Sequence, residues 1–562
     1  MPKLKLKGPP IAQAGDTGTT FGPDKKVGIP GEAKALGDFV KGQVLLGEGK
    51  FRQAIRVFGA AVQANPSDAY LRFRLATVYV RVGDLKKALQ EAKEATRLEP
   101  EGLENHLLLA GLYASVEDEE KGVREYGEVL RIDPNNQEAL LYLGALYLKL
   151  EDYEKATKNL KHLTTLNPRS LLGYYYLGRV QAKGRHYALA EKSYRKALEL
   201  NPKSKAVLMD LALVYELEEK VEDAIRTYRT LLQGNPKDVW ARKRLGKLYV
   251  GQNKLDEALG QFQKLEDIET DPRETRTKIG LIYYEKGDFE RAATEFNLVL
   301  AVEPDNDRVR YYLGSTYGAM KVYERAVEEF SRVQKKSEYF TDAHVQLAYL
   351  YDRLNQIQKA IKAVRAALQK KGDHKDILGL LASLYRKAKD FPKAVETLQK
   401  VVSLDPDNDR AHFQLGALYD ESKNKEKTIE HMKKAIELNP KNAAALNYLG
   451  YTWAEMGLHL DEAESLVRRA LKLAPNDGFY IDSLGWVYFQ KGDYEKAVEQ
   501  LKKAVNLTAD DPTIMEHLGD AYEKAGKRSN ALEHYHEALK RSKEKEQSER
   551  IREKIQHLEK AI

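Results

Sequence analysis

The sequence predicts an all-α fold, built as a solenoid of about fifteen helix-turn-helix repeats. Three observations predict it: a proline at a fixed interval, a small residue at a fixed distance after it, and an aromatic residue three positions later. Successive prolines lie 34 residues apart at Pro66, Pro100, Pro134, Pro168, Pro202 and Pro236. The same phase returns at Pro304, Pro406 and Pro440, and then one residue late at Pro475. A period of this length indicates an array in which each unit packs only on its neighbours.

The first helix of each repeat is predicted from a small residue ten positions after the proline phase. This position holds Gly42, Ala76, Ala110, Gly144, Gly178, Ala212, Gly246, Gly280, Gly314, Ala348, Ala382, Gly416, Gly450, Gly485 and Gly519. Leu143, Gly144 and Tyr147 lie at i, i+1 and i+4, so they share one helical face. The small residue allows two backbones to approach closely. Gln181 stands where nearly every other repeat has the aromatic residue.

The second helix is predicted from another small residue, usually alanine, twelve positions after the first. An aromatic or aliphatic residue follows four positions later, as in the pair Ala224 and Tyr228. The turn between the two helices often holds glycine or asparagine, such as Gly83 and Asn253. These residues tolerate the positive φ that is common at a helix end. Each repeat is therefore expected to be one antiparallel pair of helices.

The repeats cover residues 35–545, and the two ends differ from them in composition. Residues 1–34 are rich in Gly, Pro, Thr and Lys, which predicts a disordered tail or tether. Residues 546–562 are highly charged but carry an apolar stripe at i, i+4, i+7 and i+11, formed by Ile551, Ile555, Leu558 and Ile562. We expect this segment to be a helix that caps the last repeat.

The small, aromatic and proline positions together resemble the tetratricopeptide repeat (TPR) at every signature position. The resemblance covers about nine-tenths of the chain. It implies a right-handed superhelical solenoid whose concave face is lined mainly by the first helix of each repeat. It also implies a protein that works by binding other proteins.

Composition excludes several classes of function. The net charge is +7, from 92 basic and 85 acidic residues, which is too dilute over this length to indicate a nucleic-acid or membrane surface. No run of 18 apolar residues occurs, so no transmembrane segment is expected. The chain has no cysteine, which excludes disulfides, thiolate metal sites and a cysteine nucleophile.

No pattern in the sequence indicates catalysis, a cofactor or a metal site. The twelve histidines are scattered, and the close pair His534 and His536 points to different sides of its helix. The segment 47–50 has the letters GEGK, but it lacks the spacing of a phosphate-binding loop and falls in a turn between helices. We therefore expect no catalytic residues, no metal and no cofactor.

Candidate binding residues follow from the first-helix positions that the resemblance places on the concave face. In the fifth to ninth repeats these positions are basic and aromatic together: Tyr175, Tyr176, Arg179, Lys243, Arg244, Lys247, Lys278, Arg308, Tyr311 and Tyr312. Such a mixture suits an extended or acidic peptide, because it offers charge-assisted hydrogen bonds and ring faces. Ordinary repeat surface is the alternative interpretation.

The last third of the chain has a narrower resemblance. The segments 447–454, 460–463, 482–486 and 517–522 are similar to bacterial TPR proteins of the cell envelope, several of which are lipid-anchored periplasmic adaptors. That family includes partners of carboxyl-terminal processing proteases. The resemblance implies a docking surface that contains Asn447, Asp482 and Trp486. It implies a periplasmic or envelope location if a signal or lipid anchor has been removed, and otherwise we expect a cytoplasmic protein.

The sequence therefore favours a non-catalytic scaffold or adaptor that binds partner proteins or peptides. A periplasmic protease or another envelope component would be such a partner. The alternative is a structural or self-associating assembly module that has no peptide ligand. The oligomeric state and the identity of the partner do not follow from the sequence.

Overall fold

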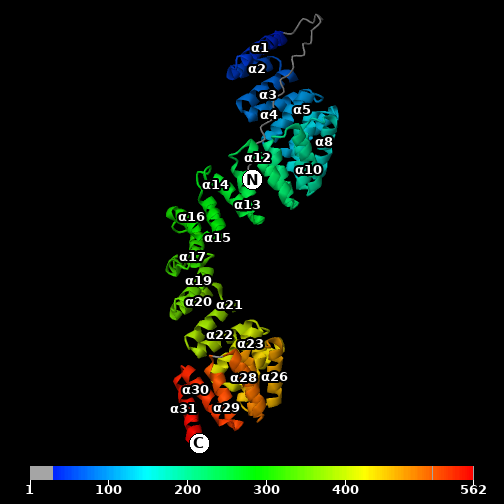
Figure 1. Cartoon of the computed structure of the whole chain (residues 1–562). Helices are drawn as coiled ribbons and strands as arrows, with labels where there is room; N and C mark the ends of the chain where they lie inside the picture. Colours follow the sequence, from blue (N-terminus) through cyan, green and yellow to red (C-terminus); the bar gives the residue numbers. More distant parts are fainter. Residues whose placement is uncertain (1–29, 509, 561–562) are drawn as a thin grey trace. The chain divides into compact units, whose positions relative to one another are not determined.

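The fold is described from a computed structural model of the chain, in which residues 30–508 and 510–560 are described. Within these residues every regular element is an α-helix, and 31 helices follow one another (Figure 1). The helices α1 to α30 form fifteen consecutive pairs, and α31 follows the last pair. The prediction of an all-α solenoid of about fifteen helix-turn-helix repeats is confirmed.

The chain divides into two compact units, residues 1–275 and 276–562. The helices of the first unit are α1 (Pro30–Gly47), α2 (Phe51–Ala64), α3 (Ala69–Val82), α4 (Leu85–Leu98), α5 (Leu103–Ser115), α6 (Glu119–Ile132), α7 (Gln137–Lys149), α8 (Tyr153–Leu166), α9 (Leu171–Lys183), α10 (Tyr187–Leu200), α11 (Lys205–Leu217), α12 (Val221–Gly234), α13 (Val239–Gly251) and α14 (Leu255–Glu266). The boundary between the units falls within α15 (Arg273–Glu285). The second unit continues with α16 (Phe289–Val302), α17 (Asp307–Ala319), α18 (Tyr323–Ser331), α19 (Phe340–Arg353), α20 (Ile357–Lys371), α21 (Lys375–Lys387), α22 (Phe391–Leu404), α23 (Asp409–Glu421), α24 (Lys425–Leu438), α25 (Ala443–Glu455), α26 (Leu460–Leu473), α27 (Gly478–Gln490), α28 (Tyr494–Leu507), α29 (Pro512–Lys524), α30 (Arg528–Arg541) and α31 (Lys545–Lys560).

The helix ends are set by polar caps at repeating positions. Before the first helix of the fourth repeat, Asn136 Oδ1 accepts a hydrogen bond from the Ala139 amide at 3.0 Å. Before the second helix, Asp152 Oδ1 accepts one from the Lys155 amide at 3.1 Å. Each cap satisfies an amide that has no partner within its own helix. The sequence thus defines where both helices of this repeat begin.

The turn between the two helices of a repeat requires a left-handed backbone. Gly83 adopts φ 83° there, as its glycine predicts. The same position in other repeats holds a larger residue with the same conformation, including Glu151 at φ 60° and Lys389 at φ 59°. The turn geometry is therefore imposed by the packing of the two helices, even where the local residue disfavours it.

The small residue of the first helix lies directly against the second helix of its own repeat. A Cβ atom added to Gly178 would lie 2.6 Å from the ring of Tyr194, and one added to Gly519 would lie 2.6 Å from the ring of Tyr535. Both rings are almost completely buried. The repeated small residue thus leaves the space into which a large side chain of the partner helix packs.

Gln181, which departs from the aromatic pattern, is also buried. Its Oε1 accepts a hydrogen bond from Ser193 Oγ on α10 at 2.7 Å, and both side chains lie in the interior. A buried amide is tolerated when its polar atoms are paired. This repeat therefore joins its two helices through a polar pair at this position.

A second recurring contact connects the proline to the helix that follows it. The side chain six residues after the proline returns to the proline carbonyl in several repeats. Arg72 Nε donates to Pro66 O at 3.0 Å, and Arg242 Nε donates to Pro236 O at 2.9 Å. Nε2 of His106 lies 3.0 Å from Pro100 O. These bonds fix the loop that connects one repeat to the first helix of the next.

The structure shows how the two ends of the array compare with the sequence prediction. Helix α1 begins at Pro30, so residues 30–34, which composition assigned to the tail, belong to a helix. The rest of the expected tail, residues 1–29, lies outside the described residues, as does Ile562. On α31, Ile551, Ile555 and Leu558 are buried in one core with the last repeats. No helix within 30–508 and 510–560 has the length and apolarity that crossing a bilayer requires.

Candidate functional site

The candidates on α9 form a compact aromatic and charged cluster with α11. The rings of Tyr175 and Tyr176 lie 5.5 Å apart, and the Arg179 guanidinium lies 5.8 Å from the centre of the Tyr175 ring. Arg179 Nε is 3.6 Å from Oδ2 of Asp210 on α11. Burial raises the pKa of the Asp210 carboxyl, and the nearby Arg179 cation partly opposes the rise. The structure thus brings these three candidates together around a carboxylate.

The candidates on α13 also face carboxylates. Nζ of Lys243 lies 2.5 Å from Oε1 of Glu269, and Nε of Arg244 lies 3.2 Å from Oε1 of Glu216 on α11. The Arg244 guanidinium also lies 5.6 Å from the ring of Trp240. Lys247 is exposed. Carboxylates of the same chain therefore pair with two of the three cations. This pairing reduces the positive charge that the cations present to a partner.

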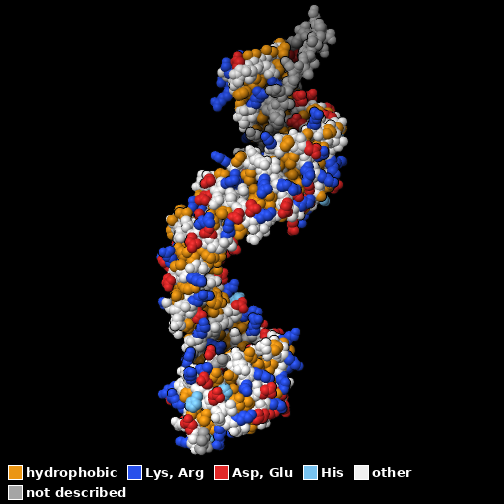
Figure 2. All heavy atoms as spheres, viewed as in Figure 1, with side chains coloured by type: hydrophobic (Ala, Val, Ile, Leu, Met, Phe, Trp, Pro, Cys, Tyr) orange, Lys and Arg blue, Asp and Glu red, His pale blue; other side chains and the backbone are white. Residues whose placement is uncertain are grey.

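Sequence reasoning missed these carboxylates, although the signal was present. Asp210 and Glu216 occupy first-helix positions of the same kind as the basic candidates, two residues before and four residues after Ala212. Figure 2 shows the same mixing of basic and acidic side chains along the visible face. The expected basic surface is thus a mixed surface, and its aromatic members distinguish it more than its charge does.

The remaining central candidates lie in the second unit. Lys278 is on α15 and Arg308 is on α17, and both are half-buried. Tyr311 and Tyr312 of α17 belong to an aromatic cluster: the Tyr339 ring lies 5.5 Å from Tyr311 and 6.2 Å from Tyr312. Burial is the largest cause of a rise in the pKa of Tyr339, to about 12. The Tyr339 hydroxyl therefore stays protonated and acts as a neutral hydrogen-bonding group.

The C-terminal candidates surround a buried histidine that sequence reasoning did not select. Nδ1 of His517 on α29 lies 2.9 Å from Oδ1 of Asp482 on α27, and both side chains are buried. The Trp486 ring stacks on the His517 imidazole with centres 4.2 Å apart, and on Phe489 at 4.6 Å. His517 thus connects two of the three C-terminal candidates. Its sequence signals were its place two residues before Gly519, among the first-helix positions that we expected to bind, and its place in the segment 517–522 that resembles envelope TPR proteins.

Two polar atoms of this C-terminal surface are buried without a partner. Within the described part of the chain, neither Asn447 Oδ1 on α25 nor Trp486 Nε1 on α27 has a hydrogen bond. Their residues are only half-buried as a whole, so each side chain also reaches the surface. A buried polar atom without a partner costs about 1–3 kcal/mol. A ligand could supply the missing bonds only if the side chains that cover these atoms move on binding.

Helix α31 closes this surface at the C-terminal end through a buried carboxylate. Glu516 on α29, only 2% exposed, accepts hydrogen bonds from Arg550 Nε and Lys554 Nζ, each at 2.8 Å. Burial alone would raise the pKa of Glu516, but the two cations prevail and lower it to about 2. The capping helix is therefore joined to the last repeat by charge as well as by its apolar stripe.

The part of the chain that the structure describes contains no set of side chains that could bind a metal ion. No group of three or more His, Asp or Glu side chains there is arranged to hold a metal ion. The His517–Asp482 pair is buried and stacked beneath Trp486, an arrangement that positions an aromatic surface.

Comparison with known families gives matches along most of the chain. A model described as TPR repeat matches residues 280–321, 382–422 and 485–526. Five models described as tetratricopeptide repeat match residues 39–102, 175–239 and 426–478, residues 216–274, residues 125–158, residues 341–372 and 409–442, and residues 513–549.

Individual relatives are similar over shorter stretches or at low identity. TPR repeat-containing protein PA4667 of Pseudomonas aeruginosa is 37% identical over 76 residues, which are 14% of this chain and 13% of that protein. The crystal structure of MamA is 28% identical, covers 28% of this chain and 94% of MamA, and has a TM-score of 0.28. YrrB, described as a TPR protein with an unusual peptide-binding site, is 20% identical over 33% of this chain and 95% of its own, with a TM-score of 0.30. The helix pairs and the family matches from residue 39 to residue 549 lead to one conclusion: the chain belongs to the tetratricopeptide repeat proteins.

Proposed function

We propose that this chain is a non-catalytic scaffold that binds partner proteins through the first helices of its repeats. The observation that carries the proposal is the pair of buried, unpartnered atoms on the C-terminal surface, Asn447 Oδ1 and Trp486 Nε1. One is an acceptor and the other is a donor. An extended peptide backbone offers both complementary groups, an N–H for Asn447 and a C=O for Trp486.

The experiment compares two variants of the full chain in a pull-down from cells of the source organism, followed by quantitative mass spectrometry. Trp486→Phe keeps the ring stacked on His517 but removes the N–H donor, and Asn447→Ala removes the acceptor. We expect each variant to lose partners that the wild-type chain retains. We also expect thermal stability to be equal or higher, because an unpaired buried polar atom has been removed.

A central binding surface is tested in the same experiment by the triple variant Lys243→Ala, Lys247→Ala and Lys278→Ala. Lys247 is exposed and the other two lysines are only half-buried, so this variant should lose little stability and fold normally. If it loses the partners while Trp486→Phe and Asn447→Ala retain them, binding depends on the basic candidates. If all three variants retain every partner, the scaffold function through these residues is wrong.

We further propose that the partner is a component of the bacterial envelope, with a carboxyl-terminal processing protease as the first candidate. The support is the resemblance of residues 445–540 to envelope TPR adaptors. Recovery of a periplasmic protease with the wild-type chain, and its loss with Trp486→Phe, is the expected result. Recovery of cytoplasmic proteins alone would contradict an envelope role and leave the scaffold function in place.

One observation favours self-association as a second function. Leu36, Val40 and Val44 lie at i, i+4 and i+8 on α1, and each is more than half exposed. At the other end of the array, the corresponding apolar side chains of α31 are buried. Light scattering over a range of protein concentrations tests this alternative, since an associating chain gains mass with concentration and Val40→Asp should abolish the gain.

A further inference from the structure

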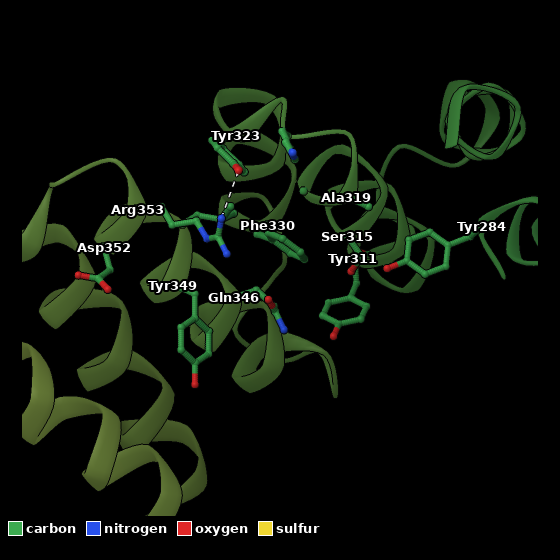
Figure 3. A pocket seen from close by; sticks show the side chains of 13 residues that line it. Tyr284, Tyr311, Ser315, Ala319, Tyr323, Phe330, Gln346, Tyr349, Asp352 and Arg353 are labelled. Carbon is green, nitrogen blue, oxygen red and sulfur yellow. Dashed lines mark hydrogen bonds between the residues drawn. The ribbon is translucent and has the colours of Figure 1, made fainter. Parts of the chain in front are cut away.

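A cleft of about 810 Å³ opens in the second unit, where α15, α17, α18 and α19 meet (Figure 3). Five aromatic residues line it: Tyr284, Tyr311, Tyr323, Phe330 and Tyr349. Figure 3 shows Tyr284, Tyr311 and Tyr349 projecting from three successive first helices. Ser315 and Gln346 add polar groups between the rings. The wall therefore combines aromatic ring faces with hydrogen-bonding groups at intervals.

The cleft lies at the least regular repeat of this unit. Helix α18 has 9 residues, whereas the second helices on either side, α16 and α20, have 14 and 15. The chain that replaces the missing turns brings Tyr339 against Tyr311, with ring centres 5.5 Å apart, and Phe330 holds the same ring at 5.5 Å. Tyr311 is thus fixed by two other rings, which lowers the entropic cost of packing a ligand against it.

One wall of the cleft carries a cation that no carboxylate balances. Arg353 is exposed, and its Nη1 contacts the Tyr323 hydroxyl at 3.4 Å, with the guanidinium 5.9 Å from the Tyr323 ring centre. Among the described residues, no Asp or Glu forms an ion pair with it. Its neighbour Asp352 is paired with Lys387 at 2.6 Å. The Tyr323 ring orients the guanidinium and leaves it able to bind an anion.

Two other arginines of the same region are neutralised by carboxylates. Arg310 Nη1 lies 2.7 Å from Glu329, and Arg332 Nη2 lies 2.6 Å from Glu328. Arg353 therefore differs from these two arginines, because its guanidinium is unbalanced and lies beside an aromatic cleft. The guanidinium and the rings together favour a ligand that carries apolar side chains next to a negative charge.

We propose that this cleft binds an extended peptide segment of a partner protein, with an acidic side chain on Arg353 and an apolar or proline side chain between Tyr311 and Tyr349. The proposal rests on the scaffold function above and names a second surface with its own partner chemistry. Ring faces favour apolar and proline side chains, and Gln346 and Ser315 can bond the peptide backbone. A single-stranded nucleic acid would also stack on rings, but it needs a continuous basic path, and the paired Asp352 carboxylate lines this one.

The test is selection of binding peptides by the full chain from a displayed random peptide library. We expect the selected peptides to share an acidic residue near apolar or proline residues. Binding of the best synthetic peptide, measured by fluorescence anisotropy, should fall about tenfold or more with Arg353→Glu or Tyr349→Ser. The same peptide with its acidic residue changed to lysine should bind Arg353→Glu better than it binds the wild-type chain.

A matched control distinguishes the cleft from general charge effects. Arg325 is also exposed and also stacks on a tyrosine, with its guanidinium 5.6 Å from the Tyr317 ring centre, but it does not line the cleft. Arg325→Glu makes the same change of charge and should leave peptide affinity unchanged. Circular dichroism should show equal helicity for all these variants, because Tyr349 is 50% exposed and Arg353 has no ion pair to lose.

The outcomes separate this proposal from the scaffold function. If peptides are selected but their binding depends on Trp486 and Asn447 and is unaffected by Arg353→Glu, the cleft proposal is wrong and the scaffold function stands. If the selected peptides lack an acidic residue, or if oligo-dT competes for the cleft better than the peptide, the proposed chemistry is wrong. If nothing is selected and the pull-down is also empty, both proposals fail.

Discussion

The imidazole of His517 and the carboxylate of Asp482 lie 2.9 Å apart in the interior, on the first helices of two adjacent repeats. Burial is the largest single influence and would lower the pKa of His517, but the charge and hydrogen bond of Asp482, together with the charges of Asp520 and Glu516, raise it above its ordinary value of 6.5. Trp486 stacks on the same imidazole. The charge state of His517 is therefore coupled to the surface that Trp486 forms.

This pair predicts that stability depends on pH. In the unfolded chain the histidine loses its proton near 6.5, whereas in the folded chain it keeps the proton to a higher pH. Its contribution is thus fully present below about pH 6.5 and is lost as pH rises through the folded pKa, with a slope of up to about 1.4 kcal/mol per pH unit. Urea unfolding at a series of pH values from mildly acidic to alkaline measures the slope.

Asp482→Asn is the control for this pH dependence. It keeps a hydrogen-bonding side chain beside His517 but removes the charge, so burial is left as the main influence and the pKa of His517 should fall. The difference in stability between the wild-type chain and the variant should shrink as pH rises. Parallel curves for the two proteins would mean that His517 is neutral in the folded state throughout.

The close approach of the two helices of a repeat predicts opposite effects for two glycine substitutions. Gly178→Ala places a Cβ 2.6 Å from the buried Tyr194 ring and should destabilise the chain by about 1–3 kcal/mol. Gly59→Ala, within α2, meets no atom within 4 Å and should stabilise it by about 0.5–1 kcal/mol. Thermal unfolding followed by circular dichroism compares them. An equal loss of stability in both variants would mean that the loss comes from helix dynamics and not from a steric clash.

The repeat architecture could be predicted from the sequence because its signals are local and recur. A steric requirement such as the Gly178–Tyr194 contact selects a small residue in every repeat, so the pattern is visible without coordinates. The turn was only partly predictable. Lys389 and Glu151 adopt the left-handed conformation that we assigned to glycine and asparagine, because helix packing overrides the local preference.

The sites could be predicted much less completely. Side chains such as Asp482 and His517 are 35 residues apart in sequence, and their pairing depends on the rotation between adjacent helices. The same holds for Lys243 and Glu269, whose ion pair changes the expected charge of the α13 surface. The cleft beside Arg353 depends on the shortened α18, and no position in the repeat pattern marks that shortening. Repetition reveals shared features, whereas binding depends on those that differ between repeats.

The buried Glu516 carboxylate predicts how α31 is held. The double variant Arg550→Met and Lys554→Met leaves a buried, unpaired charge and should cost about 3–5 kcal/mol. Adding Glu516→Met removes that charge and should recover most of the loss, because an apolar cluster replaces an ionic one. Hydrogen exchange of the α31 amides reports the local effect, and urea unfolding reports the global one. A triple variant as unstable as the double variant would contradict this explanation.

Glu516 also predicts the response of the C-terminal end to acid. Its pKa is about 2 in the folded chain against an ordinary value of 4.5, so the stabilisation it provides is present above 4.5 and is lost as pH falls towards 2. We expect the α31 amides to lose protection in this range before the central helices do. In the triple methionine variant this early loss should be absent.

The repeat array predicts that whole repeats can be removed where half repeats cannot. Deletion of residues 409–442 removes α23 and α24 and joins Asn408 to Ala443. Asn408 and Asn442 make the same cap, each accepting a hydrogen bond at 3.0 Å from the amide three residues later, so Asn408 can cap α25.

The surfaces that this deletion brings together are also equivalent. Leu415 and Gly416 on α23 correspond, 34 residues later, to Leu449 and Gly450 on α25, so α22 meets the same side chains as before. Stability in such an array is nearly a sum over repeats and their nearest neighbours. We therefore expect the shortened chain to keep its helicity per residue and a single cooperative urea transition.

Deletion of residues 409–424 removes α23 alone and places two second helices in succession, so the core faces of α22 and α24 lose their partner. That variant should lose helicity beyond the deleted residues and unfold over a broad range of urea, and equal behaviour of the two deletions would mean that neighbouring repeats do not stabilise one another.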